Sequence, residues 1–282
     1  MIDPKSSVLQ TTQNEMLEWA ENPRNRRFQF EDARQNILEH LPCESRLDFA
    51  NISSSLEKLS SWHGTVGSLR VLRGDAGGWS EIQECLYLSF WSIKILASLH
   101  ETNRRTTRRP IIFFDTPAIC LVHAIAMGDH KIAELIGNRM LQALDDESFG
   151  PLSRTPFLPF TIKLFALFKQ LPLTLEGRIV GDIPAASLGV YENIFKNWND
   201  LSELGTALIA ACDYHLGRIE EIGDEIPEFC DYPYRIFPAE IIAVLRVRQS
   251  LHLGIPEINR NCLASYPVGI GNGGPSVCGE RS

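Results

Sequence analysis

Residues 79–100 read WSEIQECLYLSFWSIKILASLH, and this stretch decides the fold class. Apolar residues recur along it at intervals of three and four, as one face of an α-helix requires. Further apolar residues occupy the other faces, and a helix that is apolar on most sides is normally central to its fold. The residues that set this spacing are Ile82, Leu86, Phe90, Ile93 and Ala97.

The same periodicity continues on both sides of this stretch. Apolar spacing predicts a helix over 30–41 and another over 47–62, which we expect to stop at Gly64. Strand signals are confined to residues 70–72 and 111–114. Capping residues and prolines mark the later helices, expected over 115–127, 129–144, 156–170, 184–198, 200–215 and 237–253. The sequence therefore predicts an all-α fold, a multi-helix bundle or irregular α-solenoid of about nine helices.

The chain has 282 residues, which fits one large domain or two closely packed ones. We expect an N-terminal helical part over 1–110 and a C-terminal helical part over 111–263, packed together as one globular unit. Residues 264–282 are rich in glycine and proline, and such a segment buries too little apolar surface to repay its ordering entropy. This tail is predicted to be flexible.

Residues 116–136 look like one ankyrin unit, with a Thr-Pro start, a first helix, a Gly-Asp break and an apolar second helix. Repeat proteins need about three stacked copies to close a core, and no second copy follows at the expected period of about 33 residues. We interpret the segment as a helical hairpin. A helical-repeat-like protein-interaction scaffold stays open as an alternative function.

The net charge and the lack of a targeting segment indicate which partners and which cellular compartment to expect. The chain carries 27 basic and 35 acidic residues, a net charge of −8 with a pI near 5.4. Nucleic acids and anionic membranes bind basic surfaces, so neither is expected as the main partner of this acidic chain. The first residues lack the apolar run of a secretory signal, and residues 85–99 contain Lys94 and are shorter than a membrane span. We expect a cytoplasmic protein.

Metal, cofactor and redox motifs are missing from the sequence. The seven cysteines are widely and irregularly spaced without a CxxC pair, which is typical of reduced thiols. His123 and His130 are seven residues apart, with no HExxH motif and no third ligand at a suitable spacing. The glycine-rich residues 74–78 lack the lysine of a phosphate-binding loop. No cofactor and no metal are predicted.

Cys212 and His215 are the most suggestive catalytic pair. They are three residues apart on one predicted helix face, and a nucleophilic cysteine needs a nearby base that lowers its pKa. A catalytic pair normally comes from different elements, so that the substrate can enter between them. A helical enzyme that uses Cys212 and His215 is kept as the less favoured alternative.

The most informative feature is an acidic segment. Residues 200–240 contain ten acidic residues against Arg218 and Arg235, an excess equal to the whole net charge. The negative charge of such a segment attracts a basic protein surface, and aromatic residues among the carboxylates can anchor the contact. The competing interpretation is a solvated acidic loop. The arginine cluster of residues 104–109 is then a solvated loop or an intramolecular partner of the acidic segment.

The C-terminal third also carries a family resemblance. Its elements are WNDL at 198–201, CDYH at 212–215, YPY at 232–234, FPAEI at 237–241, LRVR at 245–248 and GIP at 254–256. With these, residues 198–262 resemble the all-helical immunity proteins encoded beside bacterial polymorphic or type VI secretion toxins. The resemblance implies a non-enzymatic protein that binds one cognate toxin domain in the cytosol and occludes its active site. Nucleases, NAD-degrading enzymes, ADP-ribosyltransferases and deaminases all stay open as the toxin.

Resemblance and charge together predict where the toxin binds. The carboxylates are expected to face lysine or arginine around the toxin's active cleft, and the oligomeric state is left open. The expected contacts are Glu220, Glu221, Asp224, Glu225, Glu228, Asp231, Tyr232 and Tyr234, with Asp200, Asp213 and His215 as second-line candidates.

Overall fold

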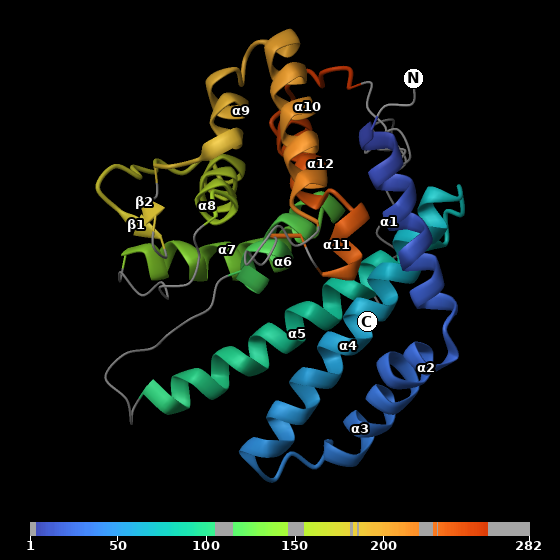
Figure 1. Cartoon of the computed structure of the whole chain (residues 1–282). Coiled ribbons are helices and arrows are strands. Elements are labelled where there is room, and N and C mark those ends of the chain that lie inside the picture. Colours follow the sequence, from blue (N-terminus) through green and yellow to red (C-terminus); the bar gives the residue numbers. More distant parts are fainter. Residues whose placement is uncertain are drawn as a thin grey trace.

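The computed structural model describes residues 4–104, 115–145, 155–180, 183–184, 186–219, 228–229 and 231–258. Within these ranges the protein is all-α, as the periodicity predicts (Figure 1). The α-helices are α1 (Pro4–Glu21), α2 (Pro23–Arg26), α3 (Asp32–His40), α4 (Arg46–Leu72), α5 (Gly78–Arg104), α6 (Asp115–Met127), α7 (His130–Asp145), α8 (Phe157–Phe168), α9 (Glu192–Lys196), α10 (Leu201–Gly217), α11 (Tyr232–Ile236) and α12 (Ala239–Ser250).

Several parts of the sequence prediction fall mostly or wholly outside the described residues, among them the strand signal at 111–114. The glycine-rich tail, 264–282, lies beyond the last described range, and so does most of the arginine cluster, of which only Arg104 belongs to α5. Within the described ranges, every helix falls short of the length and apolarity that a membrane span needs.

The helices α4 and α5 form a long antiparallel hairpin (Figure 1). Serine pairs join them: Ser53 Oγ lies 2.8 Å from Ser92 Oγ, and Ser60 Oγ lies 2.6 Å from Ser89 Oγ. The expected stop at Gly64 is wrong, because α4 continues through it to Leu72. A Cβ atom at Gly64 would lie 2.7 Å from both Cys85 Sγ and Pro233 Cβ, so this glycine lets α5 and α11 approach α4.

The start of α4 is fixed by its caps. Ser45 and Asp48 form a capping box in which each side chain accepts from the other residue's backbone N–H. Nδ1 of His40, the last residue of α3, lies 2.6 Å from Asp48 Oδ1. This pair ties the end of α3 to the start of α4. At the far end of α4, residues 70–72, considered above as a strand signal, form its last turn.

The core lies where α6, α8, α10 and α12 meet. The largest fully buried side chains include Tyr191, Phe160, Phe165, Phe229 and Phe237. Phe160 stacks on Tyr191 with ring centroids 4.1 Å apart. A salt bridge of 3.1 Å from Arg235 to Glu15 joins α11 to α1, so elements from both ends of the chain meet beside the core.

The single helix expected over 184–198 is wrong. Residues 183–184 form β2, which pairs antiparallel with β1 (Ile179–Val180), and a 3-10 turn (Gly189–Tyr191) then leads into the short α9. Gly189 has a φ of +52°, in the left-handed region that favours glycine, and a Cβ there would lie 2.9 Å from Pro156 Cγ. This break in helical geometry confines α9 to Glu192–Lys196.

Candidate functional site

Within the acidic segment, positions 220–227 lie outside the described residues, and the residues that flank them are bonded together. The loop leaves α10 at Arg218, and the backbone N–H of Phe229 returns to donate to the Arg218 carbonyl oxygen at 3.1 Å. Ile219, the first residue after Arg218, is buried. We call residues 219–228 the acidic loop.

Phe229 anchors the loop in the core. Its ring is 2% exposed and stacks on His215, with centroids 4.2 Å apart and planes at 22°. Phe157 meets the same ring edge-on at 5.4 Å. Burying a phenylalanine side chain stabilises a fold by about 1.5–3 kcal/mol, so Phe229 holds the base of the loop closed.

Below Phe229, His215 forms a buried pair with Glu240. His215 Nδ1 lies 2.7 Å from Glu240 Oε1, and both side chains are 2% exposed. The pair joins α10 to α12. The other ring nitrogen, Nε2, is buried and has no hydrogen-bond partner in the described residues. His215 is therefore part of the core of the free chain, and its predicted contact with a toxin stays a prediction.

Glu228 is also inside the protein. Its side chain is 3% exposed, and the nearest cation is Arg218, whose Nε lies 3.9 Å from Glu228 Oε2. Burial raises the pKa of Glu228. Tyr191 lies near this carboxylate, since Glu228 contributes to raising the pKa of Tyr191. The free chain encloses this carboxylate, and the predicted toxin contact of Glu228 stays a prediction.

Tyr234 is a core residue as well. Its hydroxyl lies 3.0 Å from His123 Nδ1 on α6, and the two rings meet edge-on at 5.7 Å. Tyr234 is 7% exposed, and its predicted role as a toxin contact stays a prediction. Burial lowers the pKa of His123 to about 3, so this imidazole is neutral and suited to a hydrogen bond with a phenol.

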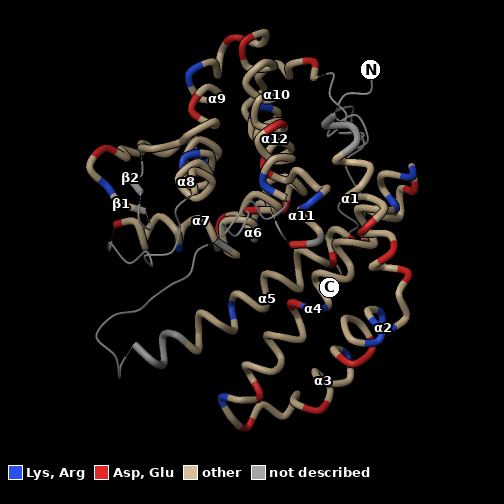
Figure 2. Tube along the Cα trace, in the orientation of Figure 1, with Lys and Arg blue, Asp and Glu red and all other residues tan. Residues whose placement is uncertain are grey.

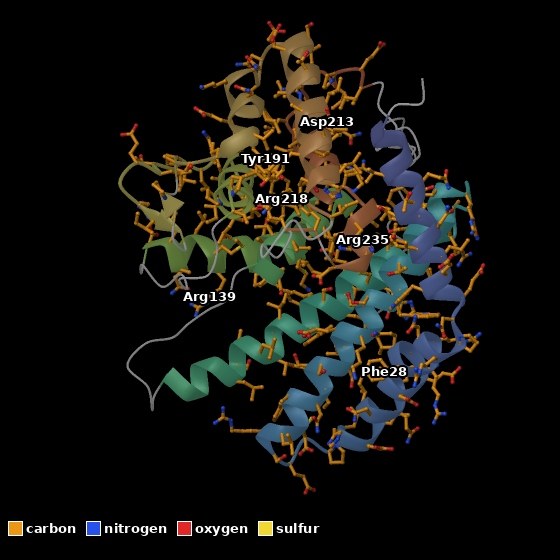
Figure 3. The ribbon with its side chains drawn as sticks, in the orientation of Figure 1. Phe28, Arg139, Tyr191, Asp213, Arg218 and Arg235 are labelled. Atoms are coloured by element: carbon orange, nitrogen blue, oxygen red, sulfur yellow. The ribbon has the colours of Figure 1, made fainter. Side chains whose placement is uncertain are left out.

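The other predicted contacts have different environments. Asp200 is exposed and caps α10 through the N–H groups of Ser202 and Glu203, near the cluster of acidic positions at the α9–α10 connection (Figure 2). Asp213 is half-buried on α10 (Figure 3) and Asp231 is exposed. Tyr232 begins α11. The remaining four, Glu220, Glu221, Asp224 and Glu225, lie outside the described residues.

The catalytic alternative gains no support from the geometry. Cys212 is completely buried and His215 is 1% exposed. The Nδ1 atom of that imidazole is bonded to Glu240, and Phe229 covers the ring face. Within the described ranges, no group of three or more His, Cys, Asp and Glu side chains is arranged to hold a metal ion.

A separate cavity of about 240 Å³ lies near the ends of α6, α8 and α12. Arg246 lines it and donates from Nε to the Ala126 carbonyl at 3.2 Å, which caps α6. His130 stacks on Phe168 at its rim. None of the predicted contact residues lines this cavity, so it is independent of the acidic loop.

The sequence pattern identified the acidic loop but did not predict the buried residues that pack beneath it. Glu240 counts toward the acidic excess of residues 200–240, and its neighbours in α12, which are almost all buried and apolar, are the signal that could have shown it to be buried. Phe229 is one of the aromatic residues interspersed in the acidic segment, and it packs in the core against His215. No family model, no curated protein and no solved structure matches this chain.

Proposed function

We propose that this chain is a non-enzymatic immunity protein that binds a cognate bacterial toxin domain in the cytosol and occludes its active site. The observation that supports this most is the closed base of the acidic loop, where the Phe229 N–H donates to the Arg218 carbonyl at 3.1 Å. The proposal also rests on the resemblance of residues 198–262 to immunity proteins. Its partner is a protein with a basic rim around its active cleft.

The loop concentrates charge on a fixed base. Glu220, Glu221, Asp224 and Glu225 fall within eight consecutive residues that contain no lysine or arginine. A basic protein surface is steered toward such a segment, and association rates rise accordingly at low salt. Bonded loop ends reduce the ordering entropy that binding must overcome. A short loop with a rigid base is therefore well suited to bind a charged cleft.

Buried candidate groups favour binding over catalysis. Inhibition by occlusion needs only a complementary surface, whereas an enzyme needs its base and nucleophile within reach of substrate. Cys212 and His215 are enclosed in the core. The helical enzyme is therefore the weaker candidate, and a repeat scaffold is disfavoured because the sequence holds no second ankyrin-like copy.

A rescue assay tests the proposal. The chain is expressed in bacteria together with the toxic product of the adjacent gene, and survival is measured. We expect the natural chain to protect, and the variant with Glu220, Glu221, Asp224 and Glu225 all changed to Lys to lose protection. The matched control reverses four exposed acids elsewhere: Glu18, Glu21, Glu44 and Glu176.

The control makes the same change in net charge and should still protect. Equal loss of protection in both variants would show that total charge, and not the loop, carries the effect. Failure of the natural chain to protect against its neighbour's product would contradict the immunity function.

A further inference from the structure

A line of exposed residues runs along α5. Its members recur at alternating intervals of four and three residues, which places them on one face of the helix. Two large aromatic residues lie at the middle of the line: Tyr87 is 43% exposed and Trp91 is 51% exposed. We call this set the α5 stripe: Ser80, Glu84, Tyr87, Trp91, Lys94 and Ser98, all exposed.

The described elements leave the α5 stripe open to solvent. The main neighbours of α5 are α4 and α6, and the C-terminal half of α5 continues past α6 (Figure 1). The turn between α6 and α7 comes near the stripe at Tyr87, whose pKa is raised by burial and by the carboxylate of Asp129. Aromatic residues are enriched where one protein binds another, so the centre of the stripe has the composition of a contact surface.

Opposite charges flank the two aromatic residues. Glu84 precedes Tyr87 by three residues, and Lys94 follows Trp91 by three. Lys94 Nζ lies 4.6 Å from the centroid of the Trp91 ring. Among the described residues, neither Glu84 nor Lys94 has a salt-bridge partner. Both charges are therefore available to a second molecule.

The α5 stripe is complementary to its own reversed copy. In an antiparallel helix pair that sets Tyr87 of one copy against Trp91 of the other, Glu84 lies opposite Lys94, because each is three residues from its aromatic neighbour. A parallel pair in register would instead place Glu84 against Glu84 and Lys94 against Lys94. Antiparallel pairing of identical surfaces has twofold symmetry, which is the commonest symmetry of protein dimers.

We propose that the α5 stripe is a homodimer interface, in which the α5 helices of two copies pair antiparallel with Tyr87 against Trp91 and Glu84 against Lys94. Twofold symmetry makes each of these contacts occur twice. The aromatic pairs supply the apolar contact area, and the charged pairs set the register and disfavour the parallel arrangement.

The length of the stripe sets the expected strength of the dimer. From Ser80 to Ser98 the helix extends for about 27 Å, and a contact made by one pair of helices is at the small end of specific interfaces. We therefore expect weak association that depends on protein concentration. The interface is on α5, away from the acidic loop, so this inference is separate from the proposed immunity function.

Analytical ultracentrifugation of the full chain tests the interface. The natural chain should pass from monomer toward dimer as its concentration rises from about 1 to about 200 μM. Glu84→Lys and Lys94→Glu each place like charges at both contacts, and each should weaken self-association by at least about tenfold. Glu203→Lys and Lys131→Glu make the same charge changes at exposed positions of α10 and α7, and they should associate like the natural chain.

An equimolar mixture of Glu84→Lys and Lys94→Glu tests the antiparallel register. In a mixed dimer, the residue introduced at position 84 of one chain lies opposite the residue introduced at position 94 of the other, and the two unchanged residues also face each other. Both charged pairs are thereby restored, so the two variants should associate with each other more strongly than either does with itself. Trp91→Ala keeps the charges but removes the aromatic contact, and it should also weaken self-association at least about tenfold.

A natural chain that stays monomeric up to about 200 μM would overturn the interface. Self-association that neither Glu84→Lys nor Lys94→Glu weakens would also overturn it, since the dimer would then use another face. Failure of the mixture to associate would contradict the antiparallel register. Circular dichroism of each variant separates a loss of association from a loss of fold.

Discussion

Nδ1 of His215 lies 2.7 Å from Oε1 of Glu240, and this contact connects α10 to α12 beneath the acidic loop. Both side chains are almost completely buried, so each is the main polar partner of the other. The imidazole in turn supports the ring of Phe229. The base of the loop therefore depends on a buried polar pair that lies outside the loop itself.

Breaking the pair from one side should be costly. His215→Ala leaves the Glu240 carboxylate buried without its partner, and we expect the free energy of unfolding in urea to fall by about 3 kcal/mol or more. The double variant His215→Leu with Glu240→Met replaces both groups by apolar ones and should lose much less. An equal loss in the single and double variants would show that the two residues do not act as a pair.

Tyr234 should matter for stability and not for binding. Tyr234→Phe removes the hydroxyl that meets His123 Nδ1, which leaves a buried imidazole nitrogen unpaired. We expect a loss of about 1–3 kcal/mol in the free energy of unfolding, with unchanged affinity for the partner. A variant that kept full stability but bound weakly would restore Tyr234 as a contact residue.

Gly137 marks the closest approach of α7 to α8. A Cβ atom there would lie 2.4 Å from the ring of Phe165, so Gly137→Ala should destabilise the protein by about 1–3 kcal/mol despite the better helix propensity of alanine. Gly217→Ala is the control, because nothing lies within 4 Å of the corresponding Cβ. Thermal unfolding of both variants checks the prediction, and similar melting temperatures would contradict it.

Low pH should weaken the hydrogen bonds of Asp48 that connect the end of α3 to the start of α4. Hydrogen bonds from Ser45 and His40 lower the pKa of Asp48, so the carboxylate stabilises the folded state at pH values above its unfolded pKa of about 3.9. That contribution is lost as the pH falls through the lower folded pKa. Asp48→Asn should therefore be less stable than the natural chain near neutral pH, and the difference should vanish in strong acid. A difference that stays constant across the titration would exclude this linkage.

The helical periodicity predicted the fold class correctly because apolar spacing follows directly from burial on one helix face. Gly64 could not be interpreted in the same way. Whether a helical glycine ends a helix or admits a neighbour depends on Cys85 and Pro233, which are distant in sequence. Local propensity carries no information on such an approach.

A count of charged residues in the sequence does not show which of them tertiary contacts bury. It found the acidic segment, but it could not separate an exposed carboxylate from one enclosed by the fold. Glu228 and Glu240 contribute to the acidic excess and yet are buried in the free chain. His215 is part of α10 and Arg218 directly follows it, so the folded structure is needed to show which acids remain available to a partner.

The most direct test of the proposed function is the association rate of the chain with the proposed toxin, taken as the product of the adjacent gene, measured at low and at physiological salt. We expect fast, salt-sensitive association for the natural chain and for the variant with Glu18, Glu21, Glu44 and Glu176 changed to Lys. Reversal of Glu220, Glu221, Asp224 and Glu225 should slow association by at least about tenfold and remove most of the salt dependence. Equal association rates for the two four-residue variants would contradict the assignment of binding to the acidic loop.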